Sequence, residues 1–594
     1  MPLAISSIQF AEFELDEERR ELRLRNRELA LQPRVFDLLC YLIRHRDRVI
    51  SKDELLDALW PGVIVTDGSL QRAISLARSA LRQGGLIDAI RTHARSGYRF
   101  CLDVIEHEGE VETYTIPELL RRARRAYEQY EWDSAIGAFE SVDSEHPLEG
   151  PDLERWADAA LCAGRGWDAI APLQRAVAAH TTQGDSYGAA RVMLNLAAVQ
   201  FEQREFAVAK GWHQRAARLL SREEISREYG TLMWLGSRFA AISGELETSR
   251  DSARRAYEIG CQLPDPDIEV LGLNYWGLAL QALGDVTQGA TLQDEAAAAV
   301  LAGNVSPMIG GIVYCSVIWS CRNRGDWQRA SQWTDHFTRW CKTSPLHNFP
   351  GTCRLHRAEV LSIRGDLEEA QKEAMAMCEA LSVRAPWAEG DAYHVLGNIY
   401  LLRGELEQAE HAFRRAHELG WDPQPGYALL QVARGATDAA LQTLELSLQD
   451  TNWANQQKRG VLLAHLVIVS IAANDIERAR NALTELDARP ELYVTDAITA
   501  AVLRARAELA TYENNLDEAI TCYRQAIQLW QNVGSPLNVA SIRILLANVF
   551  IDLGNCHAAE LELMAAEKCF QHSGATTLFD SCIALKKQLL SNMQ

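Results

Sequence analysis

The 594-residue sequence lacks a long apolar segment and a leader. Its longest nearly apolar run, 461–473, contains His465 and Ser470, and it is shorter than the roughly 20 residues that cross a bilayer. Residues 1–7 lack the basic stretch and apolar core of a signal peptide. These absences predict a cytoplasmic protein that has no membrane partner.

Cysteine is present, but not in the patterns that bind metals or build disulfide frameworks. The 13 cysteines are an odd number and include no Cys-x-x-Cys pair, and no cysteine and histidine group has zinc spacing. The sequence also lacks the phosphate-binding Gly-x-x-x-x-Gly-Lys-Ser/Thr loop and the Gly-x-Ser-x-Gly, His-Glu-x-x-His and protein-kinase motifs. We therefore expect reduced thiols, no metal, no cofactor and no enzymatic activity.

Positive charge is scarce and unevenly distributed. The chain has 60 Lys and Arg against 80 Asp and Glu. Residues 1–105 contain 16 basic and 15 acidic residues, whereas residues 106–594 contain 44 and 65. A chain of this length is too long for one core, because single cores stop growing at roughly 250–300 residues. The charge division therefore predicts a first part that binds nucleic acid and a second part with another role.

Short strands, helices and a hairpin are predicted over the first hundred residues. Residues 8–31 alternate apolar and polar side chains, which is typical of antiparallel strands with one solvated face. Apolar residues then recur at helical spacing in three segments, 32–46, 55–60 and 67–82. Residues 90–104 follow as a basic hairpin.

The third helical segment has a polar and basic face opposite its apolar one. Short polar and arginine side chains suit the base edges and phosphates of a major groove. The residues on this face that we expect to contact DNA are Ser69, Gln71, Arg72, Ser75, Arg78 and Arg82.

This order of elements closely resembles the OmpR/PhoB-type winged helix-turn-helix DNA-binding domain. The residues that carry the resemblance are PRVFDLL at 33–39, SKDELL at 51–56, DGSLQRAIS at 67–75 and GYRF at 97–100. The resemblance covers about residues 5–105, and it implies that the third helix enters the major groove of double-stranded DNA and that the hairpin is the wing. It implies wing contacts from Thr92, Arg95 and Tyr98, a loop at 61–66 that contacts RNA polymerase, and a homodimer on DNA.

The rest of the chain is a repeat with a period near 40 residues. Turn signals recur, each followed by a small residue, in most units alanine, five positions later. The anchors are Tyr130, Gly164, Arg204, Gly244, Gly284, Gly325, Gly365, Gly404, Gly435, Asn474, Asn514 and Gly554. They predict about twelve helix pairs over 118–594, after a linker at 106–117.

Residues 391–420 resemble a tetratricopeptide repeat. The signature positions are Tyr393, Leu396, Gly397, Tyr400, Gly404, Ala409, Phe413 and Ala416. The longer period resembles the sensor superhelices of MalT-like bacterial regulators. The expected fold is therefore mainly α, with an N-terminal α+β winged helix-turn-helix followed by an all-α tetratricopeptide-like superhelix.

Such arrays have a concave inner wall formed by the first helix of each pair. The lining positions implied by the resemblance are Trp234, Arg238, Asn274, Gln281, Trp319, Arg322, Asn323, Glu359, His394 and Asn398. Aromatic and hydrogen-bonding side chains together suit a polar ligand or a peptide. Tryptophans at helical spacing also arise from packing, so both interpretations stay open.

The arrangement resembles CadC-like and HilA-like regulators and predicts a one-component bacterial transcriptional regulator. The family resemblance favours an activator whose superhelix binds a small molecule or peptide. In a second hypothesis the superhelix is a docking platform for a regulatory protein and binds no small ligand. In a third, the winged helix serves protein contacts, which the near-neutral charge of residues 1–105 allows.

Overall fold

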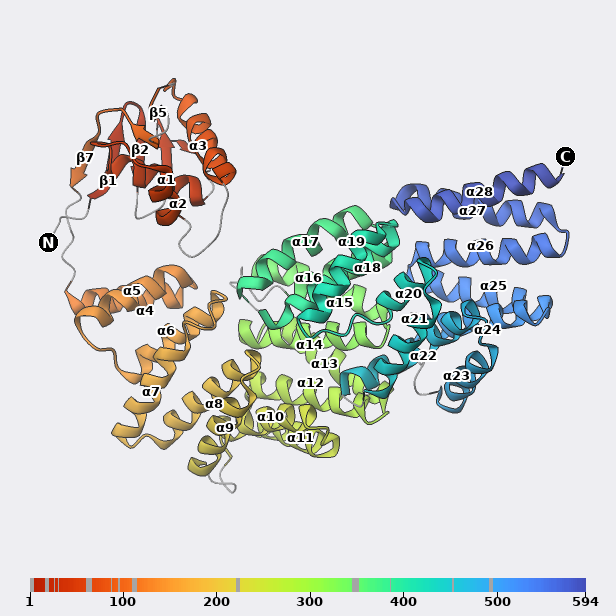
Figure 1. Ribbon diagram of the computed structural model, residues 1–594. Coiled ribbons are helices and arrows are strands. Elements are labelled where there is room, and N and C mark those ends of the chain that lie inside the picture. Colours follow the sequence, from red (N-terminus) through yellow and green to blue (C-terminus); the bar gives the residue numbers. More distant parts are fainter. Residues whose placement is uncertain are drawn as a thin grey trace. The chain divides into compact units, whose positions relative to one another are not determined.

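The structure, a computed structural model, describes residues 5–16, 21–25, 27–29, 31, 33–59, 67–86, 88–93, 97–108, 115–220, 225–344, 352–384, 386–450, 453–490 and 495–593. The chain divides into two compact units, Met1–Thr115 and Ile116–Gln594 (Figure 1). No described helix has the length and apolarity needed to cross a membrane.

An antiparallel sheet forms one side of the N-terminal unit. Its strands, in the spatial order β4-β3-β2-β1-β7, are β1 (Ile5–Phe10), β2 (Phe13–Asp16), β3 (Glu21–Leu24), β4 (Arg27–Leu29) and β7 (Ile105–Glu108). The sheet thus extends past residue 105, and residues 106–108 lie in a strand where the sequence analysis expected a linker. β7 pairs with β1 and covers backbone groups of an edge that would otherwise be unpaired.

Three helices and a hairpin complete the unit. They are α1 (Pro33–Arg44), α2 (Lys52–Leu59), α3 (Asp67–Arg82), β5 (Ile90–His93) and β6 (Gly97–Phe100). The predicted helical face of α3 is buried against α1, and the aromatic rings of Phe10, Phe13 and Phe100 lie against one another at centroid distances of 5.3 and 5.5 Å. The apolar periodicity of the sequence therefore located each of these helices.

The C-terminal unit is all-helical in its described residues. Its helices are α4 (Ile116–Glu128), α5 (Trp132–Glu145), α6 (Gly150–Cys162), α7 (Ile170–Gln183), α8 (Ser186–Glu202), α9 (Phe206–Leu219), α10 (Arg227–Ile242), α11 (Leu246–Gln262), α12 (Pro266–Ala282), α13 (Val286–Leu301), α14 (Pro307–Asn323), α15 (Trp327–Thr343), α16 (Thr352–Arg364), α17 (Leu367–Arg384), α18 (Pro386–Arg403), α19 (Leu406–Glu418), α20 (Gly426–Ala433), α21 (Thr437–Gln449), α22 (Trp453–Ala472), α23 (Ile476–Ala488), α24 (Asp496–Tyr512), α25 (Leu516–Val533), α26 (Pro536–Asp552), α27 (Cys556–Ser573) and α28 (Thr576–Met593). They form a tetratricopeptide-like superhelix (Figure 1).

Every anchor residue lies in the left-handed backbone region. The twelve φ angles range from +60° at Asn474 to +100° at Gly284, and each anchor ends the first helix of a pair. The residue five positions later is buried in the facing helix in all twelve units; it is alanine except at Ser249 and Gly289. A left-handed residue ends a helix and reverses the chain, and a small residue then lets the second helix pack closely.

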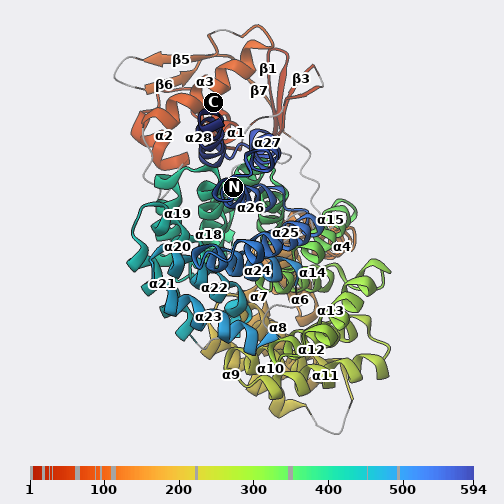
Figure 2. The same ribbon diagram turned by 90° about the vertical axis from the view of Figure 1, so that its right-hand side faces the viewer.

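Successive turns of the superhelix contact one another. α12 and α14 lie against α22, and α16 lies against α26. α15 lies against α25 (Figure 2). The Thr495 hydroxyl donates to the Arg324 carbonyl at 3.2 Å, and the Thr576 hydroxyl donates to the Arg403 carbonyl at 2.8 Å. We call this set of contacts the seam. It joins the turns at 324–325, 365 and 403–404 to the helix starts at Thr495, Pro536 and Thr576.

Among the cysteines whose side chains the structure describes, eleven are free thiols, but Cys315 is disulfide-bonded. The expectation of reduced thiols is wrong at this position, because spacing along the sequence does not report which thiols meet in space.

The seam predicts that two glycines with the same backbone geometry respond differently to alanine. Gly404 and Gly435 have φ angles of +80° and +78°, but a Cβ at Gly404 would overlap Thr577, whereas a Cβ at Gly435 would meet nothing. Gly435→Ala should therefore cost only the left-handed strain, roughly 1–2 kcal/mol. Gly404→Ala should cost more and should speed amide hydrogen exchange in α28. Equal exchange in α28 for the two variants would contradict the seam.

Candidate functional site

The outward face of α3 lies opposite the apolar side chains that the helix buries. Leu70, Ile74 and Leu81 are at most 2% exposed. Gln71, Ser75 and Arg82, which lie on the opposite side, are exposed. The side chains of Ser69 and Arg72 lie outside the described residues, so their predicted contacts stay predictions.

Arg78 connects α3 to the hairpin. Its guanidinium donates to the Ile90 carbonyl at 2.9 and 3.1 Å and to the Thr92 hydroxyl at 2.8 Å. The sequence predicted a DNA contact for Arg78 but not this connection. The three bonds fix the orientation of the first hairpin strand relative to α3.

The second hairpin strand is anchored to the core. Tyr98 is 6% exposed, and its backbone pairs with that of Ile50 at 2.9 Å in both directions. Tyr98 thus packs inside the unit, whereas Arg91 and Thr92 on the first strand are exposed. Arg95 at the hairpin tip and the loop at 61–66 lie outside the described residues.

Among the described residues of this surface, Arg82 and Arg91 are exposed arginines. Neither Arg82 nor Arg91 forms an ion pair with a described carboxylate. Unpaired guanidinium groups on one surface attract phosphate without first breaking an internal salt bridge. The face formed by α3 and β5 is called the α3 face below.

In the superhelix, the predicted lining residues fall into separate groups. Arg238 lies against aromatic rings, 4.1 Å from the centroid of Phe201 and 5.4 Å from that of Trp234, and it pairs with Glu202. This first group is a packed cation–π cluster. Trp319 is half-buried.

Asn274 and Gln281 form a second group that is satisfied mainly by internal hydrogen bonds. Gln293 donates to Asn274 at 3.1 Å, Gln281 donates to Gln293 at 2.6 Å, and Ser320 donates to Gln281 at 3.1 Å. This chain of buried amides links α12, α13 and α14.

The third group converges on one buried charged cluster. Arg322 on α14 donates two hydrogen bonds to Asp391 on α18, at 2.6 and 2.7 Å, and pairs with Glu359 on α16. Asn398, one turn beyond His394 on α18, donates to His394 Nε2 at 3.1 Å. We call Arg322, Glu359, Asp391, His394 and their neighbour Lys458 the axial cluster.

Burial and charge shift the pKa values in this cluster in opposite directions. Burial raises the pKa of Glu359 despite the adjacent Arg322. Burial would also raise the pKa of Asp391, but the bidentate Arg322 outweighs it and holds this pKa below its usual value. Burial lowers the pKa of both His356 and His394 to about 3, so both rings are neutral at pH 7.

Sequence reasoning found Arg322, Asn323, Glu359, His394 and Asn398 but missed Asp391, His356 and Lys458. Asp391 lies on the same face of α18 as His394 and Asn398. The helical spacing of these three residues in the sequence could have identified it. Lys458 lies on α22, which meets α14 only because the superhelix turns back on itself.

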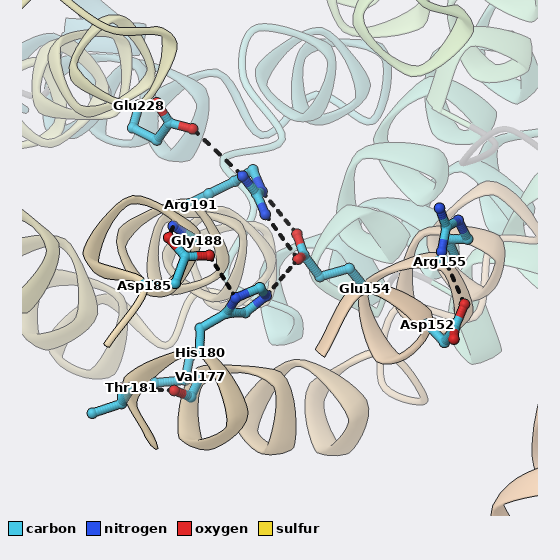
Figure 3. Close-up of polar contacts among 10 residues, drawn as sticks. All are labelled: Asp152, Glu154, Arg155, Val177, His180, Thr181, Asp185, Gly188, Arg191 and Glu228. Carbon is cyan, nitrogen blue, oxygen red and sulfur yellow. Dashed lines mark hydrogen bonds and ion pairs between the residues drawn. The ribbon is translucent and has the colours of Figure 1, made fainter. Parts of the chain in front are cut away.

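Another polar network surrounds the buried His180 among α6, α7 and α8 (Figure 3). His180 Nδ1 lies 2.9 Å from Asp185, and its Nε2 lies 2.8 Å from Glu154. Arg191 donates to both oxygens of Glu154 at 2.9 Å. The partners satisfy one another, so we interpret this network as a structural connection. No group of three or more His, Cys, Asp or Glu among the described residues is arranged to hold a metal.

Comparison with known proteins identifies the two parts of the chain. Residues 26–100 match the family described as transcriptional regulatory protein, C terminal, and residues 390–419 and 498–571 match tetratricopeptide repeats. The N-terminal unit is an OmpR/PhoB-type DNA-binding domain. The C-terminal unit is a tetratricopeptide-repeat domain.

Three relatives show how far the similarity extends. The transcriptional activator CadC of Escherichia coli is 37% identical over 89 residues, which cover 14% of this chain and 17% of CadC. The phosphate regulon protein PhoB of Rhizobium meliloti is 33% identical over 92 residues, 15% of this chain and 40% of PhoB. The regulator MalT of Vibrio parahaemolyticus is 27% identical over 206 residues, 32% of this chain and 22% of MalT. The chain spans less than half the length of each relative, and all three are named as regulators of transcription rather than enzymes.

The two neutral histidines predict that acid destabilises the superhelix. Their folded pKa values of about 3 lie below the ordinary value of 6.5, so between these pH values the unfolded chain binds protons that the folded chain does not. Their contribution is complete above pH 6.5 and falls by about 1.4 kcal/mol per pH unit per histidine below it. The unfolding midpoint, measured from pH 7 to pH 4, should fall steeply.

A pair of variants separates this effect from general acid denaturation. His394→Gln should make the midpoint less dependent on pH, whereas His557→Gln, at an exposed position, should leave the dependence unchanged. An unchanged slope in His394→Gln would contradict the assignment.

Proposed function

We propose that this chain is a one-component transcriptional regulator, which binds double-stranded DNA through the α3 face and a signal through the superhelix. The observation that carries the proposal is the α3 face itself. It presents exposed polar side chains together with Arg82 on α3 and Arg91 on β5, neither of which forms an ion pair with a described carboxylate. The OmpR/PhoB-type family places α3 in the major groove. Gln71 and Ser75 would contact base edges, and Arg82, Arg91 and Thr92 would contact the backbone. Ser69, Arg72 and Arg95 complete the proposed surface. Tyr98 is left out because it is buried.

Activation is the proposed direction of control. It is supported by the similarity to CadC, which is named as an activator. In this proposal the loop at 61–66 meets RNA polymerase, and two copies bind repeated half-sites. The signal would change the spacing or pairing of the two DNA-binding units.

A small polar molecule or peptide is the proposed signal, because the axial cluster gathers charged and hydrogen-bonding side chains on the inner helices. A protein-docking role is the second candidate. It is favoured by Leu561 and Met564, which lie one turn apart on α27 and are 55% and 51% exposed. Exposed apolar neighbours on a repeat array suit a protein partner.

Charge removal on the α3 face should weaken DNA binding. Arg82→Ala and Arg91→Ala should each reduce affinity for a sequence selected by the wild-type chain from random DNA by about 1–3 kcal/mol, roughly 5- to 150-fold. If the lost contact is to phosphate, the slope of log affinity against log salt should fall by about 1. Affinity is measured by gel shift at several salt concentrations.

Arg218→Ala is the matched control, because it removes the same charge from an exposed position on the superhelix. Arg78→Ala should also weaken DNA binding, while it loosens the hairpin by removing the bonds to Ile90 and Thr92. Affinities for Arg82→Ala and Arg91→Ala equal to that of Arg218→Ala would refute the proposed interface.

A further inference from the structure

Lys458 is a cation that lacks a close anionic partner inside the superhelix. It lies on α22, half-buried, with its Nζ 5.5 Å from the centroid of the Trp421 ring. No described carboxylate oxygen lies within 4.0 Å of Nζ. Burial lowers its pKa, and the positive charge of Arg322 adds to this effect. A lysine in such a place costs stability unless something else compensates its charge.

The axial cluster supplies that compensation only over a longer distance. Its two carboxylates, Asp391 and Glu359, are both engaged by Arg322. Asp422 attracts Lys458 over a longer distance, but it forms no ion pair with it. One Asp422 oxygen accepts hydrogen bonds from the Gln424 backbone and the Ser447 hydroxyl, both at 3.2 Å. The other oxygen, Oδ2, is buried without a partner.

Hydrogen-bond donors without partners surround the same place. Because Asn398 donates to His394 Nε2, the neutral His394 ring carries its proton on Nδ1, which is buried and unpartnered. Trp421 Nε1 is likewise buried without an acceptor. Trp421 packs beside Gly390 at the start of the α18 face that carries Asp391 and His394. Buried polar groups almost always have partners, so this set indicates a ligand.

The distribution of charge selects the class of ligand. Lys458, His394 and Trp421 offer donors and one positive charge, and Asp422 offers an acceptor and a negative charge. These opposite charges attract each other but form no ion pair. A molecule that bears a carboxylate and an ammonium group complements both. A phosphate dianion would exceed the single lysine charge, and a neutral sugar would leave it uncompensated.

We propose that Lys458, Trp421, His394 and Asp422 bind a free amino acid as a zwitterion, with its carboxylate at Lys458, Trp421 and His394 and its ammonium at Asp422. This inference rests on the proposed function and names the chemical class of its signal. The amino acid supplies Lys458 and Asp422 with close counterions, so it stabilises the folded superhelix.

The first test is a thermal-shift series on the full chain with each common amino acid at millimolar concentration. Lactate, ethylamine, inorganic phosphate and glucose serve as partial or unrelated probes. One or a few amino acids should raise the unfolding midpoint by at least about 2 °C near saturation, and the four other probes should not. No shift with any amino acid, or an equal shift with lactate, phosphate or glucose, would overturn the proposal.

Variants test whether the thermal shift arises from binding at Lys458 and Asp422. Lys458→Met and Asp422→Asn should abolish it, whereas Lys372→Met, at a lysine that is 79% exposed, should retain it. Without amino acid, Lys458→Met should unfold at the same or a higher temperature than the wild type, because it removes a half-buried charge that has no close partner. A lower midpoint for Lys458→Met in the absence of amino acid would make Lys458 a structural residue and would also overturn the proposal.

Gel shifts on the same proteins separate this inference from the function on which it rests. DNA binding that depends on Arg82 and Arg91, together with no response to any amino acid, would refute the amino-acid proposal and support the regulator proposal. An amino-acid shift without DNA binding would support the amino-acid proposal and refute the regulator proposal.

Discussion

A backbone reversal repeated twelve times determines the superhelix. Each anchor residue takes a left-handed conformation, and a small buried residue five positions later lets the second helix lie close to the first. Because the reversals recur at nearly constant spacing, the rotation between neighbouring pairs accumulates until one turn of the superhelix meets the next. The seam is one consequence, and the contacts of α22 with α12 and α14 and of α26 with α16 are another. Residues more than a hundred positions apart, such as Arg322 and Lys458, therefore belong to one cluster.

The axial cluster costs more folding free energy than a purely structural element would need. A buried arginine shared by two carboxylates rarely stabilises more than apolar packing would, and each buried polar atom without a partner costs about 1–3 kcal/mol. The network around His180 shows that this chain also builds a polar cluster whose members satisfy one another. Near Lys458, buried polar atoms of His394, Trp421 and Asp422 lack partners, and a bound ligand would provide them.

Local pattern predicted most of the architecture. Apolar spacing located α1, α2 and α3, and the anchors located the reversals, because both depend on neighbouring residues. The sequence analysis missed β7 because its acidic residues have a low propensity for strands. β7 forms because it pairs with the edge strand β1. The connection from Arg78 to the hairpin and the burial of Tyr98 depend on packing between α3, β5 and β6. Three of the ten predicted lining residues, Arg322, Glu359 and His394, meet in the axial cluster. Lys458 joins it through the superhelical turn, which is a property of the whole array.

Sequencing of genomic DNA retained by the purified full chain, at low and at moderate salt, tests the central claim most directly. The account predicts that a repeated motif upstream of a small set of genes is enriched at both salt concentrations, and that a chain carrying both Arg82→Ala and Arg91→Ala loses this enrichment. Retention of DNA without a motif, or equal enrichment by that double variant, would contradict it.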